Sequence, residues 1–161
     1  MNIYVIYLGE PKEKYLRDAL SEYEKRISAF GKLTNIGLKP VSLPDNPSEK
    51  EIVSALEKEA DGILLQLNKL QGSKKIALCV EGRQLSSEQL SAYLDRAAVD
   101  GCSSVAFVIG SSFGLSERVK ARCDLRLSFS AMTFPHQLMR VILEEQIYRA
   151  FSISSGSKYH K

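Results

Sequence analysis

The sequence has few cysteines, no long apolar run and almost no excess of one charge. Its three cysteines, Cys79, Cys102 and Cys123, lack the spacing of a metal site. An odd, scattered set of cysteines fits a reducing cytoplasm better than a disulfide framework. No stretch approaches the roughly 20 apolar residues that a membrane-spanning helix needs. We therefore expect a cytoplasmic protein that has no metal site and no membrane contact.

The charge of the chain is close to balanced. Lysine and arginine number 22 against 19 acidic residues, which gives a net charge of +3. This excess is too small to indicate a nucleic-acid partner by itself. Linkers, repeats and low-complexity segments are also absent. A length of 161 residues with 44% hydrophobic and 25% charged side chains predicts one globular domain over residues 1–161.

The chain alternates between strand patterns and helix patterns. Its first apolar run, Ile3–Leu8, is short and lacks the basic lead of a signal peptide, so it predicts a strand. Ser48 with Glu51, and Ser86 with Gln89, have the spacing of capping boxes and predict two helix starts. Further buried strands are predicted at Lys75–Val80, Ser104–Ile109 and Leu125–Phe129, with an irregular or edge strand at Leu33–Leu43.

This alternation predicts an α/β fold with a mostly parallel sheet that helices cover on both faces. Ligands bind such sheets beyond the carboxyl ends of the strands. Three of those ends fall at Leu78–Gly82, Gly110–Gly114 and Phe129–Phe134. If the three strands are neighbours, their loops converge on one pocket.

The segment Gly110–Gly114 admits three interpretations. It matches the G-x-S-x-G nucleophile elbow, with Ser112 as nucleophile and with Asp124 and a histidine, His136 or His160, following in the chain order of a hydrolase triad. Its two glycines also suit a loop whose backbone approaches a ligand closely. A tight turn without a ligand is the third. The motif alone leaves all three open.

The segment Phe129–Phe134 is unusually apolar for a connection, since loops are mostly polar. Its aromatic and apolar side chains either pack into the core or form the wall of a slot for a flat ring. Pro135 then suits the first position of a helix over residues 136–151. That helix has a wide apolar arc, part of which can face a second subunit.

Candidate functional side chains follow on this helix and in the tail. Arg149 has Glu145 at the favourable ion-pair spacing, which favours a structural role. Arg140 is the better candidate for contacting an anion or RNA. The chain closes on Tyr159, His160 and Lys161, an unusual group for a terminus, where chains are normally frayed.

Several segments of the sequence together resemble a known family. The run Leu127–Phe151, with its S-x-M-T-F-P-H-Q-x-M-R motif, the Tyr159–Lys161 terminus, the Ile109-Gly110 loop and the segment Lys14–Arg26 are similar to the bacterial ribosomal RNA large subunit methyltransferase H family. These are SPOUT-class enzymes that use S-adenosylmethionine to methylate N3 of a pseudouridine in large-subunit ribosomal RNA. The resemblance implies a C-terminal trefoil knot, a homodimer and the assembled ribosome as partner.

The resemblance also implies a set of site residues. The catalytic candidates are His160, Tyr159 and Arg140, with His160 as proton acceptor or substrate contact, and the tail is expected to reach a site shared between subunits. The positions that match the family's cofactor-binding residues are Leu78, Gly110, Phe129, Ser130, Ala131, Met132, Thr133 and Phe134.

One position departs from the family pattern. Ser111 stands where relatives usually have a second glycine, so its Cβ adds bulk where the backbone is expected near the cofactor. Relatives often carry proline at the position of Ser112, which argues against a nucleophile there. Two alternatives to the methyltransferase are a serine hydrolase that uses Ser112 and a ribosome-binding module without activity.

Overall fold

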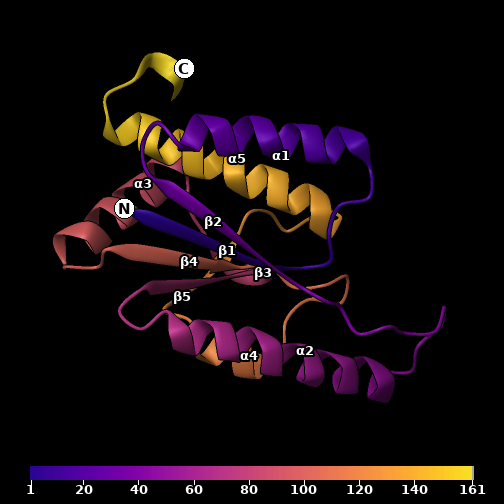
Figure 1. The fold of residues 1–161 in the computed structure, drawn as a ribbon. Coiled ribbons are helices and arrows are strands. Elements are labelled where there is room, and N and C mark those ends of the chain that lie inside the picture. The colour runs from indigo at the N-terminus through magenta and orange to yellow at the C-terminus, as the bar shows by residue number, and fades with distance from the viewer. Residues whose placement is uncertain (161) are drawn as a thin grey trace.

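Five parallel strands form one sheet, in the order β2-β1-β4-β3-β5, at the centre of the molecule (Figure 1). The structure is a computed structural model that describes residues 1–160; the side chain of His160 and all of Lys161 lie outside the described part. The predicted parallel α/β sheet is confirmed. Its strands are β1 (Asn2–Leu8), β2 (Lys32–Leu38), β3 (Lys74–Gln84), β4 (Ser104–Val108) and β5 (Leu125–Ser128).

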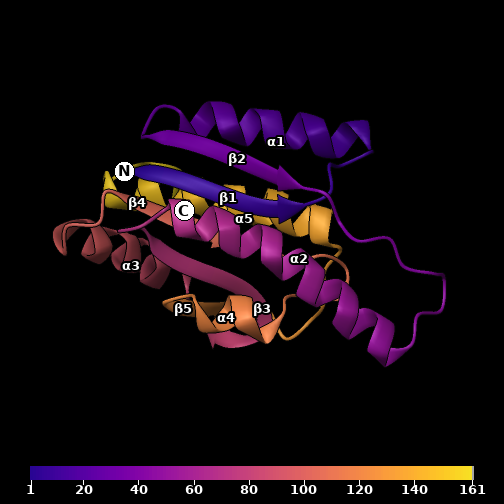
Figure 2. The ribbon, with the colours of Figure 1, turned by 60° about the horizontal axis from the view of Figure 1, so that its bottom comes forward.

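Helices cover both faces of the sheet, and each face has its own apolar cluster. Three helices lie on one side and two on the other, as Figures 1 and 2 show from two directions. A single 3-10 turn, η1 (Lys158–His160), follows the last helix. The first side carries α1 (Lys14–Ile27), α3 (Ser87–Val99) and α5 (His136–Ser154), and the second carries α2 (Glu49–Lys69) and α4 (Glu117–Ala121).

The two predicted capping boxes are confirmed. The hydroxyl of Ser48 accepts a hydrogen bond from the backbone N–H of Glu51 at 3.2 Å, and that of Ser86 accepts one from Gln89 at 3.1 Å. Each box satisfies backbone donors that have no partner within the helix. Local sequence therefore determines where α2 and α3 begin.

The edge strand β2 is shorter than the sequence predicts. The apolar pattern runs to Leu43, but the strand ends at Leu38. It ends there because Pro40 has no N–H to donate to the ladder of a neighbouring strand. Gly37 lies inside this strand, and a Cβ there would sit 2.5 Å from Oε1 of Glu10 and 2.9 Å from the hydroxyl of Tyr7. The glycine therefore leaves room for side chains that cross the strand.

The strand β3 is longer than predicted and contains a large irregularity. Leu78 and Arg83 both pair with Leu127 of β5, so residues 79–82 are looped out of the ladder. Gly82 closes this bulge, since a Cβ on it would lie 2.7 Å from the backbone of Arg126. The bulge carries residues 79–81 to the carboxyl end of the sheet, next to the loop that follows β4.

A buried ionic network joins α5 to α1 and β1. Nε of Arg140 lies 3.3 Å from Oε1 of Glu144, and Nη2 lies 3.4 Å from Oε1 of Glu24. The guanidinium also stacks 3.8 Å above the ring of Tyr7. Arg140 is 4% exposed and Glu144 is fully buried at 0%. Burial raises the pKa of Glu144 to about 8, although the charge of Arg140 opposes the shift.

Replacing Glu144 with glutamine should flatten the pH dependence of stability. A carboxyl whose pKa rises from 4.5 to about 8 on folding binds its proton more tightly in the folded state. Its contribution is complete below pH 4.5 and is lost as the pH rises through about 8. Thermal melts across this window should show a smaller loss of Tm with rising pH in Glu144→Gln than in the parent. Equal slopes would contradict the assignment.

Candidate functional site

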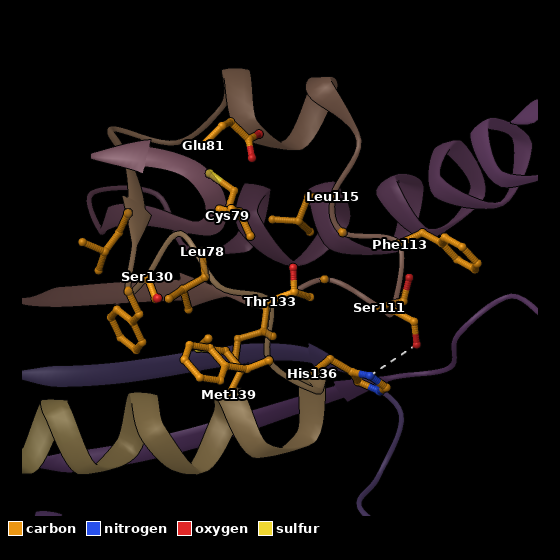
Figure 3. A pocket seen from close by; sticks show the side chains of 18 of the residues that line it. Leu78, Cys79, Glu81, Ser111, Phe113, Leu115, Ser130, Thr133, His136 and Met139 are labelled. Carbon is orange, nitrogen blue, oxygen red and sulfur yellow. Dashed lines mark hydrogen bonds between the residues drawn. The ribbon is translucent and has the colours of Figure 1, made fainter. Parts of the chain in front are cut away.

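A cavity of about 320 Å³ opens beyond the carboxyl ends of β3, β4 and β5 (Figure 3). Its walls come from residues 78–81 of the β3 bulge, from the loop over residues 109–115 and from residues 127–134. Two side chains of α5, His136 and Met139, complete it. The sequence predicts that these three loops converge, and the order β4-β3-β5 confirms that their strands are neighbours.

Most of the predicted cofactor-binding residues lie in this wall. Ala131 is the exception, because it is exposed and does not line the cavity. Hydrogen bonds within the last loop explain its shape: the Ser128 hydroxyl donates to the carbonyl of Ser130, and the Ser130 hydroxyl accepts from the N–H of Met132, both at 3.0 Å. The predicted residues that line the cavity are Leu78, Gly110, Phe129, Ser130, Met132, Thr133 and Phe134.

The cavity combines apolar walls with a charged rim. Leu78, Leu127 and Phe129 offer surfaces that suit a flat ring, while the backbone of the surrounding loops offers donors and acceptors for its edge. At the rim Lys120 forms an ion pair with Glu81, and this hydrogen bond holds the pKa of Glu81 below its usual value. The arrangement is that of a small-molecule site with few polar anchors.

The loop after β4 depends on its glycines for its own closure. A Cβ on Gly110 would lie 2.2 Å from the carbonyl oxygen of Gly114, and Gly114 has a φ of 90°. Among residues 1–160 only glycines have positive φ, so Ser111 is unstrained. The Ser111 hydroxyl donates to Oε1 of Glu59 at 2.7 Å. The serine that replaces the family's usual glycine is thus accommodated by a partner on α2.

Comparison with known proteins identifies the family. Residues 1–160 match a family model described as "Predicted SPOUT methyltransferase". The chain belongs to the SPOUT methyltransferase family. It is 49% identical over 162 residues to the ribosomal RNA large subunit methyltransferase H of Clostridium beijerinckii, and 50% identical over 161 residues to that of Bacillus thuringiensis, with 100% of both chains covered each time.

Solved structures agree with the SPOUT fold. A probable methylase family protein from Haemophilus influenzae superposes with a TM-score of 0.55 at 15% identity, over 99% of this chain and 70% of that one. At this identity the likeness shows the fold alone. The trefoil knot stays a prediction that family membership supports. Within residues 1–160 no helix is long and apolar enough to cross a membrane, and no group of three metal-ligating side chains occurs.

The SPOUT chain lacks a hydrolase triad in its described residues. Oγ of Ser112 lies 3.4 Å from Nδ1 of His136, the contact drawn in Figure 3. Asp124, however, accepts a hydrogen bond from the backbone N–H of Lys75 at 2.7 Å, at the opposite, amino-terminal edge of the sheet. Ser112 also lacks positive φ, whereas a nucleophile elbow is a sharp, strained turn. Nothing here supports Ser112 as a nucleophile.

Two of the predicted catalytic residues, Arg140 and Tyr159, do not line the cavity of their own chain. Arg140 lies in the buried network with Glu144 and Glu24. Tyr159 packs edge-on against Tyr148, with ring centroids 4.7 Å apart, about 18 Å along α5 from His136 at the cavity. The 19 residues of α5 span about 28 Å. His160, as a side chain, and Lys161 lie outside the described residues.

Sequence reasoning predicted the loop Leu78–Gly82 as part of the site, but it missed the bulge in β3 and the role of Glu59. Val80 and Glu81 enter the cavity because of the bulge in β3, for which Gly82 inside an apolar strand pattern was the only available signal. Glu59 is 6% exposed and bonds to Ser111, but it lies on α2, far away in the sequence. No local pattern connects it to the loop after β4.

Proposed function

We propose that this protein is an S-adenosylmethionine-dependent methyltransferase that acts on N3 of a pseudouridine in large-subunit ribosomal RNA. The observation that carries the proposal is full-length identity of 50% over 161 residues to a protein named ribosomal RNA large subunit methyltransferase H. The most specific family segment, Phe129–Phe134, supports it by forming a cavity wall. The small net charge of +3 favours recognition of the assembled ribosome by shape over capture of free RNA.

The cavity fits the proposed methyl donor. Its volume of about 320 Å³ falls within the size range of small-molecule sites. In the proposal Leu78 and Phe129 hold the adenine ring, and the backbone at Gly110 and over residues 130–134 bonds to polar edges. When bound, S-adenosylmethionine supplies a methyl carbon made electrophilic by the adjoining sulfonium. The apolar walls exclude water from that carbon.

The proposal places the active site between two subunits. Tyr159 packs on Tyr148, which lies about 18 Å along α5 from His136 at the cavity, so a homodimer with antiparallel α5 helices would bring each tail to the cavity of the other chain. Leu138, which is 39% exposed at the cavity end of α5, offers apolar surface for such contact. His160 of the partner subunit then accepts the N3 proton, and Tyr159 of the partner subunit positions the base. Arg140 positions α5 through Glu144 and Glu24.

Calorimetric titration with S-adenosylmethionine tests the proposal. We expect one binding event per chain, which Leu78→Trp should abolish by filling the cavity. The matched control is Val99→Trp, because Val99 is 82% exposed at the end of α3 and lines none of the three cavities.

The two alternative functions predict different results. A ribosome-binding module without activity predicts no heat of binding, and a hydrolase predicts ester turnover that Ser112→Ala abolishes. Either result would contradict the methyltransferase assignment.

A further inference from the structure

A second cavity of about 210 Å³ adjoins the first and has no role in the function proposed so far. The two cavities share Ser111, Ser112, Phe113 and His136, so these side chains form a common wall (Figure 3 shows it from the first cavity). The remaining walls come from residues 40–43, after β2, and from α2. A molecule in the second cavity would therefore lie next to a methyl donor in the first.

The polar group of this second cavity is Glu59. It is 6% exposed, and its carboxylate accepts hydrogen bonds from the Ser111 hydroxyl at 2.7 Å and from the N–H of Val41 at 3.1 Å. Both of these donors are neutral. Each carboxylate oxygen has about two acceptor sites, so each retains capacity for another donor. Glu59 thus brings negative charge to an otherwise largely apolar cavity, where an N–H donor binds strongly.

The neighbouring histidine does not neutralise this charge. Burial lowers the pKa of His136, and although the charge of Glu59 opposes the shift, the imidazole stays neutral at pH 7. Its Nδ1 contacts Oγ of Ser112 at 3.4 Å. The side chain of His136 therefore lines both cavities without forming an ion pair that would block Glu59.

Pseudouridine carries the donor that such a site would recognise. Its base joins the ribose through carbon, so ring N1 keeps a hydrogen, whereas N1 of uridine is bonded to the sugar and donates nothing. We propose that the second cavity holds the target base and that Glu59 accepts its N1–H, which selects pseudouridine over uridine. This inference rests on the proposed function and names a specificity-determining residue for it.

The shape of the base agrees with this placement. N1 and N3 are two positions apart in the ring, so an N1–H that points at Glu59 leaves N3 free for methylation. Phe113 is 47% exposed and lines both cavities, which makes its ring available for stacking on an extruded base. N3–H lies between the two carbonyl groups of the base, whereas N1–H has only one carbonyl beside it. Repulsion between the carboxylate and the carbonyl oxygens therefore favours N1–H as the donor to Glu59.

The ratio of methylation rates on pseudouridine and uridine tests the inference. The substrates are large ribosomal subunits that carry either nucleotide at the target position. The parent should prefer pseudouridine by at least about tenfold, which corresponds to one charge-assisted hydrogen bond. Glu59→Gln should lower the ratio, because the neutral amide oxygen accepts a weaker hydrogen bond than the carboxylate does. The matched control is Asp61→Asn, which removes the same charge from the same helix at a side chain that is 72% exposed and pairs with Arg118.

The outcomes separate this inference from the proposed function. An equal slowing of both substrates in Glu59→Gln, with an unchanged ratio, would mean a structural role and overturn the inference. Equal rates of the parent on both substrates would overturn it too, while methyl transfer itself would stand. If Glu59→Gln does not fold, the parent enzyme can be tested on ribosomal subunits that carry N1-methylpseudouridine, which has no N1–H. The parent should methylate these subunits at least about tenfold more slowly than subunits with pseudouridine. Equal rates would overturn the inference. Methylation of neither nucleotide would contradict the proposed function.

Discussion

Deletion of residues 159–161 should reduce methylation by at least about 100-fold, the usual contribution of a positioned proton acceptor. The affinity for S-adenosylmethionine should stay within about twofold of the parent, since Tyr159 lines no part of its own cavity and packs on Tyr148, about 18 Å along α5 from His136. Tyr159 contacts the second half of α5, through the ring of Tyr148, the guanidinium of Arg149 and the carboxylate of Glu145, and it also lies beside Tyr23 of α1. Its loss therefore leaves the cofactor wall intact. Calorimetry and a methylation assay on ribosomal subunits measure the two quantities separately.

Mixed dimers make this test specific for a shared site. The tail-deleted chain keeps its cavity, and a Leu78→Trp chain keeps its tail, so a dimer of one with the other has one complete site. Random mixing should restore about a quarter of the parental activity, because half of the dimers are mixed and each has one working site of two. Unchanged activity of the tail-deleted protein would contradict a catalytic tail. Failure of the mixture would contradict a tail that acts on the partner's cavity.

Much of the fold follows from local sequence, and so does the position of the cavity. The capping boxes at Ser48 and Ser86 determine two helix starts, and the apolar strands determine a parallel sheet. Its carboxyl edge then brings the loops together. The bulge over residues 79–82 depends on pairing with β5, which lies more than 40 residues further along the chain. Gly82 is therefore the only local sequence signal of this bulge.

Burial of polar side chains was the harder part to predict. Helical spacing places His136, Arg140 and Glu144 on one face of α5, and such a face is usually exposed. In the structure this face meets α1 and β1, where Tyr7 and Glu24 supply partners for the guanidinium. These side chains of α5 are buried because their partners come from elements more than 100 residues away in the sequence. A single helix pattern carries no information about them.

Replacing Arg140 with methionine should lower the free energy of unfolding at pH 7 by about 1–3 kcal/mol, the usual cost of leaving a buried polar group, here the Glu144 carboxyl, without its hydrogen-bond partner. Arg140 is 5% exposed as a side chain and Glu144 is 0% exposed, and Oε2 of Glu144 has no hydrogen-bond partner among the described side chains. The double variant Arg140→Met/Glu144→Leu should recover to within about 1 kcal/mol of the parent, because well-packed apolar side chains often replace a buried ion pair at little cost. Glu24 and Glu10 are 40% and 70% exposed, so water can solvate them after the change. Urea denaturation of both variants measures these values.

The double variant also decides between two roles for Arg140. A guanidinium held by Glu144 and Glu24 acts on the site only by fixing α5, which carries His136 and Met139 into the cavity wall. Restored packing should then restore methylation to within about threefold of the parent, since packing alone keeps α5 in place. A double variant that is as stable as the parent but loses methylation by about 100-fold would show that the guanidinium itself contacts the substrate or the reacting atoms. If Arg140 is a positioning residue, stability and activity should both fall in the single variant and both recover in the double variant. A catalytic arginine cannot produce that pattern, because the double variant still lacks its guanidinium.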